Sequence, residues 1–138
     1  MNEADRIIAH LALTPHPEGG WYRQTWQGPT VGGRASGTAI LFLLKAGERS
    51  HWHHVDADEI WLWHAGAPVL LSLGQERAVD HLLGPEVLVG QAPQIVVPAG
   101  DWQAARSTGV YSLVSCTVSP GFDFAGFVLA PPGFDLPR

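Results

Sequence analysis

The feature that most constrains the fold is a series of short β-prone runs that begins at Thr38. The runs are separated by Gly, Pro or charged residues, and they include TAILFLL, EIWLW, PVLLSL, QIVVP and YSLVSCTVS. Their spacing is short and fairly even, and no segment between them has a helical period of useful length. The pattern therefore predicts an all-β fold, either a sandwich or a closed barrel of antiparallel strands.

A single helix is predicted ahead of these runs, from Asn2 to Leu13. Asn2 can cap the helix, acidic residues occupy its first turn, and isoleucines and leucines form an apolar stripe. The Thr14-Pro15 pair ends it. Between this helix and the β-prone runs, Gln27 to Gly37 is predicted as a Gly-rich loop.

The composition excludes some partners. The 138 residues carry a net charge of −5 with eight scattered basic residues, which argues against a nucleic-acid partner. Charged residues make up only 15 %, so we expect a second subunit to cover part of the surface. The one cysteine, Cys116, lies in an apolar run and is expected to be a small core residue. The N-terminus has neither a secretion signal nor a transmembrane pattern, so we expect a cytoplasmic protein without a membrane partner.

The segment Gly47–Gly66, GERSHWHHVDADEIWLWHAG, concentrates histidines, tryptophans and carboxylates. This mixture is typical of an apolar-walled pocket that carries a few polar groups. Side chains alternate faces along a strand, so if Glu59 points into a barrel, Trp61 and Trp63 point the same way. The segment therefore predicts a carboxylate beside two indoles in one cavity.

The same segment resembles the first motif of the cupin superfamily, G-x5-H-x-H-x3/4-E-x6-G. Both glycines are present, and His53 and Glu59 stand at the first His and the Glu, whereas Val55 replaces the second His. The second cupin motif contains P-x-G-x2-H-x3-N. Its Pro and Gly are present here, with Gln103 in place of the His and Ser107 in place of the Asn.

A narrower resemblance, to the Cupin_5 (DUF985) group, covers nearly the whole chain. It rests on HPEGGWYRQT, WHHVDADEIWLWHAG, PQIVVPAGDWQAA and LVSCTVSPGFDFAGF. The resemblance implies a double-stranded β-helix, or cupin jelly roll, that usually pairs as a homodimer. We expect one domain over residues 1–138, with an N-terminal helix over 1–14, the jelly roll over 15–130 and a tail over 131–138. The resemblance implies no particular activity, because related folds include sugar-nucleotide epimerases, storage globulins and metal-dependent oxygenases.

A typical cupin metal site uses three His and one Glu, which suit transition metals. Here only His53, Glu59 and Gln103 remain as candidate ligands, and this mixture binds metal weakly. We therefore expect no metal and no other cofactor. The metal hypothesis would revive if His51, two residues before His53, pointed inward beside it.

Without a metal, His53 and Glu59 form a candidate catalytic pair for proton transfer, because desolvation should raise the pKa of the carboxyl. Alternatively, both side chains join Gln103 in a polar network that only holds the pocket shape. Arg23 could hold an anionic group through its planar fork. The predicted ligand pocket comprises Tyr22, Arg23, His51, Trp61, Trp63, Trp102 and Gln103.

Three functions remain open from the sequence. The first is a cupin that binds a small polar molecule, sugar-like or nucleotide-like, in its barrel, with a metal-independent epimerase or isomerase as its enzymatic form. The second is a non-catalytic binding module with the same pocket. The third is a metal-dependent cupin enzyme such as a dioxygenase.

Overall fold

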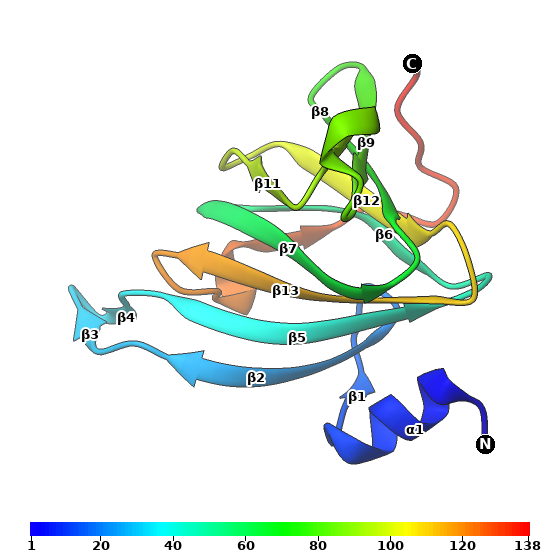
Figure 1. Cartoon of the computed structure of the whole chain (residues 1–138). Coiled ribbons are helices and arrows are strands. Elements are labelled where there is room, and N and C mark those ends of the chain that lie inside the picture. The colour runs from blue at the N-terminus through cyan, green and yellow to red at the C-terminus, as the bar shows by residue number, and fades with distance from the viewer.

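The computed structural model describes all residues from 1 to 138 and contains two six-stranded sheets that enclose one main core (Figure 1). Side chains from both sheets fill the space between them, among them Phe42, Trp61, Leu71 and Val114. The strands of each sheet pair antiparallel except for one short parallel pair at an edge. The predicted all-β jelly roll with a short N-terminal helix is confirmed.

The first sheet contains, in spatial order, β1 (Thr14–Pro15), β2 (Trp21–Gln27), β5 (Thr38–Lys45), β13 (Tyr111–Ser119), β7 (Asp58–Gly66) and β11 (Gln94–Val97). The second sheet contains β10 (Gln91–Ala92), β9 (Ala78–Leu83), β8 (Val69–Gly74), β12 (Trp102–Ser107), β6 (Arg49–Val55) and β14 (Phe127–Leu129). The remaining elements are the helix α1 (Glu3–His10), the ribbon of β3 (Thr30–Val31) and β4 (Arg34–Ala35), and the 3-10 turns η1 (Val87–Val89) and η2 (Phe124–Gly126).

The helix α1 packs on the outer face of the first sheet, where Ala4 and Leu13 bury against Leu43 (Figure 1). The Asn2 side chain accepts a hydrogen bond from the Asp5 backbone N–H, so Asn2 caps the helix as predicted. The helix ends three residues before the predicted Leu13, because the chain turns at Ala12 with a φ of 54°. This helix has eight residues. No helix in the structure has the length and hydropathy needed to cross a membrane.

The segment predicted as a Gly-rich loop instead contains the β3–β4 ribbon, whose turn uses Gly32 and Gly33 at positive φ. Arg34 ties the ribbon to the body of the protein. Its guanidinium donates to the two carboxylate oxygens of Asp56 at 2.8 and 3.1 Å and to the Gly121 carbonyl at 2.7 Å. These contacts give the segment a defined structure that its composition alone does not predict.

The strand β6 carries a bulge opposite β12. Gln103 of β12 pairs with His53 of β6, and Ala105 of β12 pairs with Ser50 of β6. Between these two pairs β12 advances by two residues, whereas β6 advances by three. One extra residue on β6 interrupts the alternation of faces. As a result Ser50 and His53 both contact the barrel interior, whereas the Trp52 between them packs on the outside.

The C-terminal tail, residues 131–138, crosses the outer face of the second sheet. Phe134 of the tail lies with its ring centroid 4.7 Å from that of Trp102 and 6.2 Å from that of Trp52. Leu136 is buried in the same small cluster. The tail therefore covers a second, minor apolar cluster outside the barrel.

Candidate functional site

The first group of the site is the buried carboxyl of Glu18, which lies on the connection between β1 and β2 and points into the barrel. Glu18 is only 8 % exposed; its Oε1 accepts from the Ser50 hydroxyl at 2.9 Å, and its Oε2 lies 3.1 Å from His53 Nε2. The following Gly19 and Gly20 both adopt positive φ, and a Cβ at Gly20 would crowd the ring of Phe42. The Glu-Gly-Gly sequence thus makes the tight turn that delivers the carboxyl inward.

The hydrogen bonds define the proton positions on His53. Its Nδ1 lies 2.8 Å from the His51 carbonyl, which can only accept, so Nδ1 carries a proton. Burial lowers the pKa of His53 and raises the pKa of Glu18 to about 8. At neutral pH the imidazole is therefore neutral, and the protonated Glu18 donates to its Nε2.

A second buried carboxyl, Glu59, is held by a chain of side-chain hydrogen bonds. The Trp61 indole N–H donates to Gln103 Oε1 at 2.8 Å, and Gln103 Nε2 donates to Glu59 Oε1 at 2.9 Å. Because an indole can only donate, this contact determines the orientation of the Gln103 amide. Burial raises the pKa of Glu59 to about 7, and burial beside Glu59 raises the pKa of the Cys116 thiol.

The fold family implies a metal, but the donors in the barrel do not fit the usual metal set. Val55 has no donor atom, and the Gln103 oxygen is occupied by the Trp61 N–H. No group of three or more His, Cys, Asp or Glu side chains is arranged to hold a metal ion. His51 does not converge with His53 either, because its Nε2 lies 3.0 Å from the Pro131 carbonyl of the C-terminal tail.

A pocket of about 380 Å³ lies between the β1–β2 segment, β5 and the η2 turn, and we call it the mouth pocket. It is lined by Ala12, Thr14, His16, Tyr22, Arg23, Gln24, Ile40, Phe122 and Phe124. His16 Nδ1 accepts from the Glu18 backbone N–H at 3.1 Å, so its proton is on Nε2. Burial, followed by the nearby His53, lowers the pKa of His16 to about 4. The imidazole is therefore neutral at pH 7.

The free donor of this pocket is the Nε2–H of His16. The His16 side chain is 5 % exposed, its other ring nitrogen is already engaged, and Nε2 has no hydrogen-bond partner in the protein. A donor at a pocket wall that has no partner within the protein favours a ligand that brings an acceptor. Every fully buried side-chain nitrogen and oxygen of the protein has a partner, so the unpartnered Nε2 of His16 keeps some exposure to the pocket.

The structure distributes the predicted site residues over three places. Tyr22 and Arg23 line the mouth pocket. His53, Glu59, Gln103 and Trp61 lie in the barrel interior, and Trp63 packs at the edge of the main core while its indole donates to the Ala67 carbonyl at 3.2 Å.

Two residues predicted for the pocket lie outside the barrel. Trp102 packs against His54 and Phe134, because alternation along β12 turns it away from the side of Gln103. His51 contacts the C-terminal tail, because the bulge in β6 breaks the period that would have placed it beside His53. The structure therefore does not bring these two residues together with His53 and Gln103.

The local sequence does not mark His16 and Glu18 as site residues. A Glu before two glycines has the pattern of a turn, and a His after a helix-ending Pro has no chemical signature of its own. The only available signal was their position in HPEGGWYRQT, a segment in which a carboxylate and an imidazole stand two residues apart. Their roles depend on the contacts of Glu18 with β6, which the local sequence does not specify.

The two-sheet barrel with polar groups inside it defines a protein of the cupin, double-stranded β-helix class. The chain belongs to the family described as Cupin superfamily (DUF985), Cupin_5, whose sequence profile matches residues 5–130. No curated protein matches it.

Solved structures agree with this assignment. A Shewanella oneidensis protein is 38 % identical with a TM-score of 0.89, and the match covers 94 % of this chain and 85 % of that one. A hypothetical protein from Leishmania major is 32 % identical with a TM-score of 0.86, covering 94 % and 88 %. An uncharacterised Klebsiella pneumoniae protein with a double-stranded β-helix domain, 13 % identical with a TM-score of 0.61 over 95 % and 96 %, shares the fold alone.

Proposed function

We propose that this cupin binds a small polar molecule, sugar-like or nucleotide-like, in the mouth pocket. The observation that carries the proposal is the unpartnered Nε2–H of the partly buried His16 in the wall of a pocket of about 380 Å³. This donor would pair with a carbonyl, hydroxyl or phosphate oxygen of the ligand. The family membership is compatible with the proposal but does not select a ligand.

The walls of the pocket support a ligand with both a flat and a charged part. Tyr22, Phe122 and Phe124 offer aromatic faces on which a sugar or base can stack. Arg23 also lines the pocket, and its guanidinium makes no hydrogen bond or ion pair within the protein. Its planar fork suits a phosphate or carboxylate. These features favour a sugar phosphate or a nucleotide over an uncharged hydrocarbon.

A second candidate function is epimerisation or isomerisation by proton transfer. The observation that favours it is the cluster of titratable groups behind His16: Nδ1 of His16 lies 3.7 Å from the Glu18 carboxyl, which contacts His53. In this hypothesis a neutral His16 N–H stabilises negative charge on a substrate carbonyl oxygen while the proton of the adjacent carbon passes, through solvent in the pocket, to the ionised fraction of Glu59. Glu59, with a pKa of about 7, is suited to hold or return a proton at neutral pH.

The binding hypothesis is tested with a thermal-shift screen of sugar phosphates, sugar nucleotides and nucleotides, followed by calorimetry of the hits. We expect at least one hit whose affinity falls about tenfold or more in His16→Phe, which removes the donor and keeps a ring. His81→Phe makes the same substitution at an exposed histidine of β9 and should leave the affinity unchanged. A hit that His16→Phe does not weaken would place the ligand elsewhere and contradict the proposal.

The enzymatic form is tested on the same hits by incubation in D₂O and mass spectrometry. Incorporation of solvent deuterium above the rate of His53→Ala is the expected result for an epimerase or isomerase. No incorporation above that background, with binding intact, would leave the non-catalytic binding module as the function.

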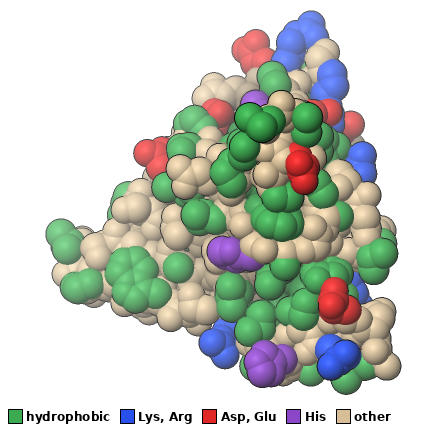
Figure 2. All heavy atoms as spheres, in the orientation of Figure 1, with side chains coloured by type: hydrophobic (Ala, Val, Ile, Leu, Met, Phe, Trp, Pro, Cys, Tyr) green, Lys and Arg blue, Asp and Glu red, His purple; other side chains and the backbone are tan.

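We also propose that the chain pairs as a homodimer. Support comes from its low charged fraction and from apolar side chains exposed around η1, where Leu88 is 96 % exposed (Figure 2). Light scattering should give about twice the chain mass of 14.9 kDa. A mass equal to one chain at micromolar concentration would contradict the dimer.

A further inference from the structure

Two arginines stand directly opposite each other on the outer face of the second sheet. Arg49 of β6 and Arg106 of β12 are register partners. The ion pairs of the structure use other cations, and neither of these guanidiniums donates a side-chain hydrogen bond within the protein. Like charges directly opposite on neighbouring strands repel each other. An acceptor from outside the protein would relieve this repulsion.

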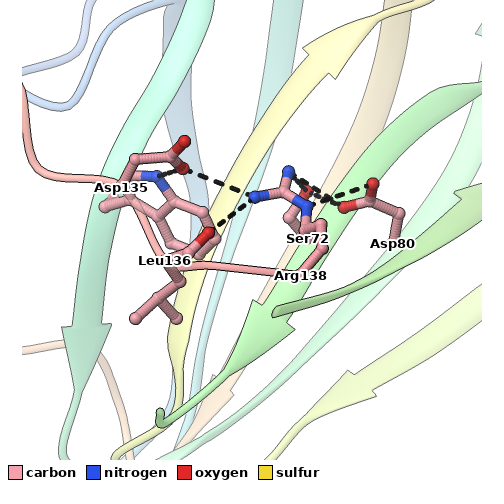
Figure 3. Close-up of polar contacts among 6 residues, drawn as sticks. Ser72, Asp80, Asp135, Leu136 and Arg138 are labelled. Atoms are coloured by element: carbon pink, nitrogen blue, oxygen red, sulfur yellow. Dashed lines mark hydrogen bonds and ion pairs between the residues drawn. The ribbon is translucent and has the colours of Figure 1, made fainter. Parts of the chain in front are cut away.

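A third arginine completes the arrangement. Arg138 of the C-terminal tail donates to the Leu136 carbonyl at 2.9 Å and lies between Asp80 and Asp135 (Figure 3). Both carboxylates are already engaged, because Asp80 also accepts from the Ser72 hydroxyl and Asp135 from the Trp52 indole. Three guanidiniums against two carboxylates leave an excess of one positive charge.

The three arginines share one small pocket, which we call the arginine pocket. It has a volume of about 90 Å³ and is lined by Arg49, Arg106 and Arg138 together with Ser50, His51, Trp52, Leu70, Ser72, Ala104, Ala105 and Asp135. In Figure 2, Lys and Arg side chains gather along the edge of the molecule that carries the C-terminal tail. This concentration stands out in a chain with only eight basic residues and a net charge of −5.

We propose that the arginine pocket is a second ligand site, which binds one compact oxyanion such as inorganic phosphate or the phosphate group of a monoester. Guanidinium forks match the oxygens of a phosphate and bind them through two parallel N–H donors each. The small volume fits a single anionic group, and the rest of a larger molecule would extend into solvent.

This site is separate from the mouth pocket, because the two share no lining residue. The mouth pocket lies at the barrel end beside β2 and η2, whereas the arginine pocket lies on the outside of β6, β12 and β8. The proposal therefore does not rest on the proposed function.

The test is titration with inorganic phosphate at constant ionic strength, with sodium chloride as the balancing salt, read by melting temperature and by calorimetry. We expect a saturable rise of the melting temperature in the wild type. Arg106→Ala should melt at the same or a higher temperature without phosphate, because the repulsion is gone, and should lose the response to phosphate. Arg106→Lys keeps the charge but not the fork and should bind at least several-fold more weakly than the wild type.

Two matched variants locate the response. Arg6→Ala removes an exposed arginine from α1 and should respond to phosphate like the wild type. Arg23→Ala removes the arginine of the mouth pocket and should also respond normally. The proposal is overturned if phosphate raises the melting temperature no more than chloride does, if Arg106→Ala retains the response, or if Arg23→Ala abolishes it.

Discussion

The two faces of the β6–β12 strand pair differ in whether their polar side chains are charged and whether they have hydrogen-bond partners. On the inner face, Gln103 and His53 are register partners that each have hydrogen-bond partners and carry no charge at neutral pH. On the outer face of the same pair, Arg49 and Arg106 are register partners that carry two like charges without an acceptor. The same two strands thus hold a satisfied neutral network on one side and an unbalanced charge on the other.

The difference has a physical cause. Inside the barrel, burial makes an unpaired charge costly, so the pKa values of the buried groups move toward their neutral forms and their polar atoms find partners. Outside, water solvates the guanidiniums, so their repulsion is tolerated. The inner network therefore stabilises the fold, whereas groups that remain unpaired, such as the arginines and the His16 N–H, are the better candidates for ligand contacts.

The largest expected effect comes from breaking the inner network with Gln103→Leu. This substitution leaves the Trp61 N–H without an acceptor and removes one donor from the Glu59 carboxyl, which keeps its contact with Cys116. The loss of these two buried hydrogen bonds should cost about 2–5 kcal/mol of unfolding free energy. Urea denaturation followed by circular dichroism measures the loss. The exposed Gln75→Leu, which breaks one surface hydrogen bond to Asp101, is the control and should change stability by less than about 0.5 kcal/mol. Equal effects of the two substitutions would mean that the inner network does not stabilise the fold.

The next effect tests whether the C-terminal tail belongs to the same cooperative unit as the barrel. Leu136→Ala opens the small outer cluster beside Trp52 and should cost about 2 kcal/mol, the lower end for a buried leucine because the site lies at the surface and can collapse. The urea midpoint should shift while the transition remains single. Val110→Ala, at a residue that is 71 % exposed, is the comparison and should leave the midpoint in place. A second, earlier transition would show that the tail unfolds separately.

A third prediction concerns pH. The raised pKa values of Glu18, about 8, and Glu59, about 7, mean that the folded protein holds these protons more tightly than the unfolded chain. Stability must therefore fall as pH rises through the window between 4.5 and about 8. The lowered pKa of His16, about 4, has the opposite effect, because it makes stability rise with pH between about 4 and 6.5. The fall in stability should therefore be clearest between pH 6.5 and 8. We expect the unfolding free energy to fall by about 2 kcal/mol between pH 6.5 and 8.

The matched variant for this prediction is Glu18→Gln, because a glutamine reproduces the hydrogen bonds of a protonated glutamate to Ser50 and His53. It should fold with near wild-type stability at pH 6 and lose most of the decline toward pH 8. A decline as steep as that of the wild type would mean that Glu18 is not the group that ionises.

The smallest effect is expected on the outer face. Arg138→Gln removes two ion pairs, to Asp80 and Asp135, but all three side chains are more than a third exposed. Solvent-exposed ion pairs contribute little, so the unfolding free energy should change by less than about 1 kcal/mol. Urea denaturation of the wild type and of Arg138→Gln, in low and in high salt, measures this change in unfolding free energy. A loss as large as that of Gln103→Leu would reverse the comparison between the two faces.

The sequence predicts the fold well and the site only in part. The β-prone runs and the motif from Gly47 to Gly66 are local signals, and the structure confirms the jelly roll that they indicate. Trp102 and Gln103 are adjacent in sequence, so strand alternation should have placed only one of them inside. The bulge that separates His51 from His53 is different, because it depends on the pairing of β6 with β12 and leaves no local trace. The burial of Glu18 likewise follows from a contact with Ser50, 32 residues away along the chain.

The hydrogen bond from Trp61 to Gln103 gives the protein a built-in optical reporter. Trp61 is 1 % exposed, and its indole is connected through one amide to the Glu59 carboxyl. When Glu59 loses its proton, a negative charge appears at the far end of that amide and changes the electric field at the indole. The intrinsic fluorescence of the folded protein should therefore titrate near pH 7, and a Trp61→Phe difference spectrum would assign the signal among the six tryptophans. The protonation state of the barrel interior can thus be followed without a ligand or a label.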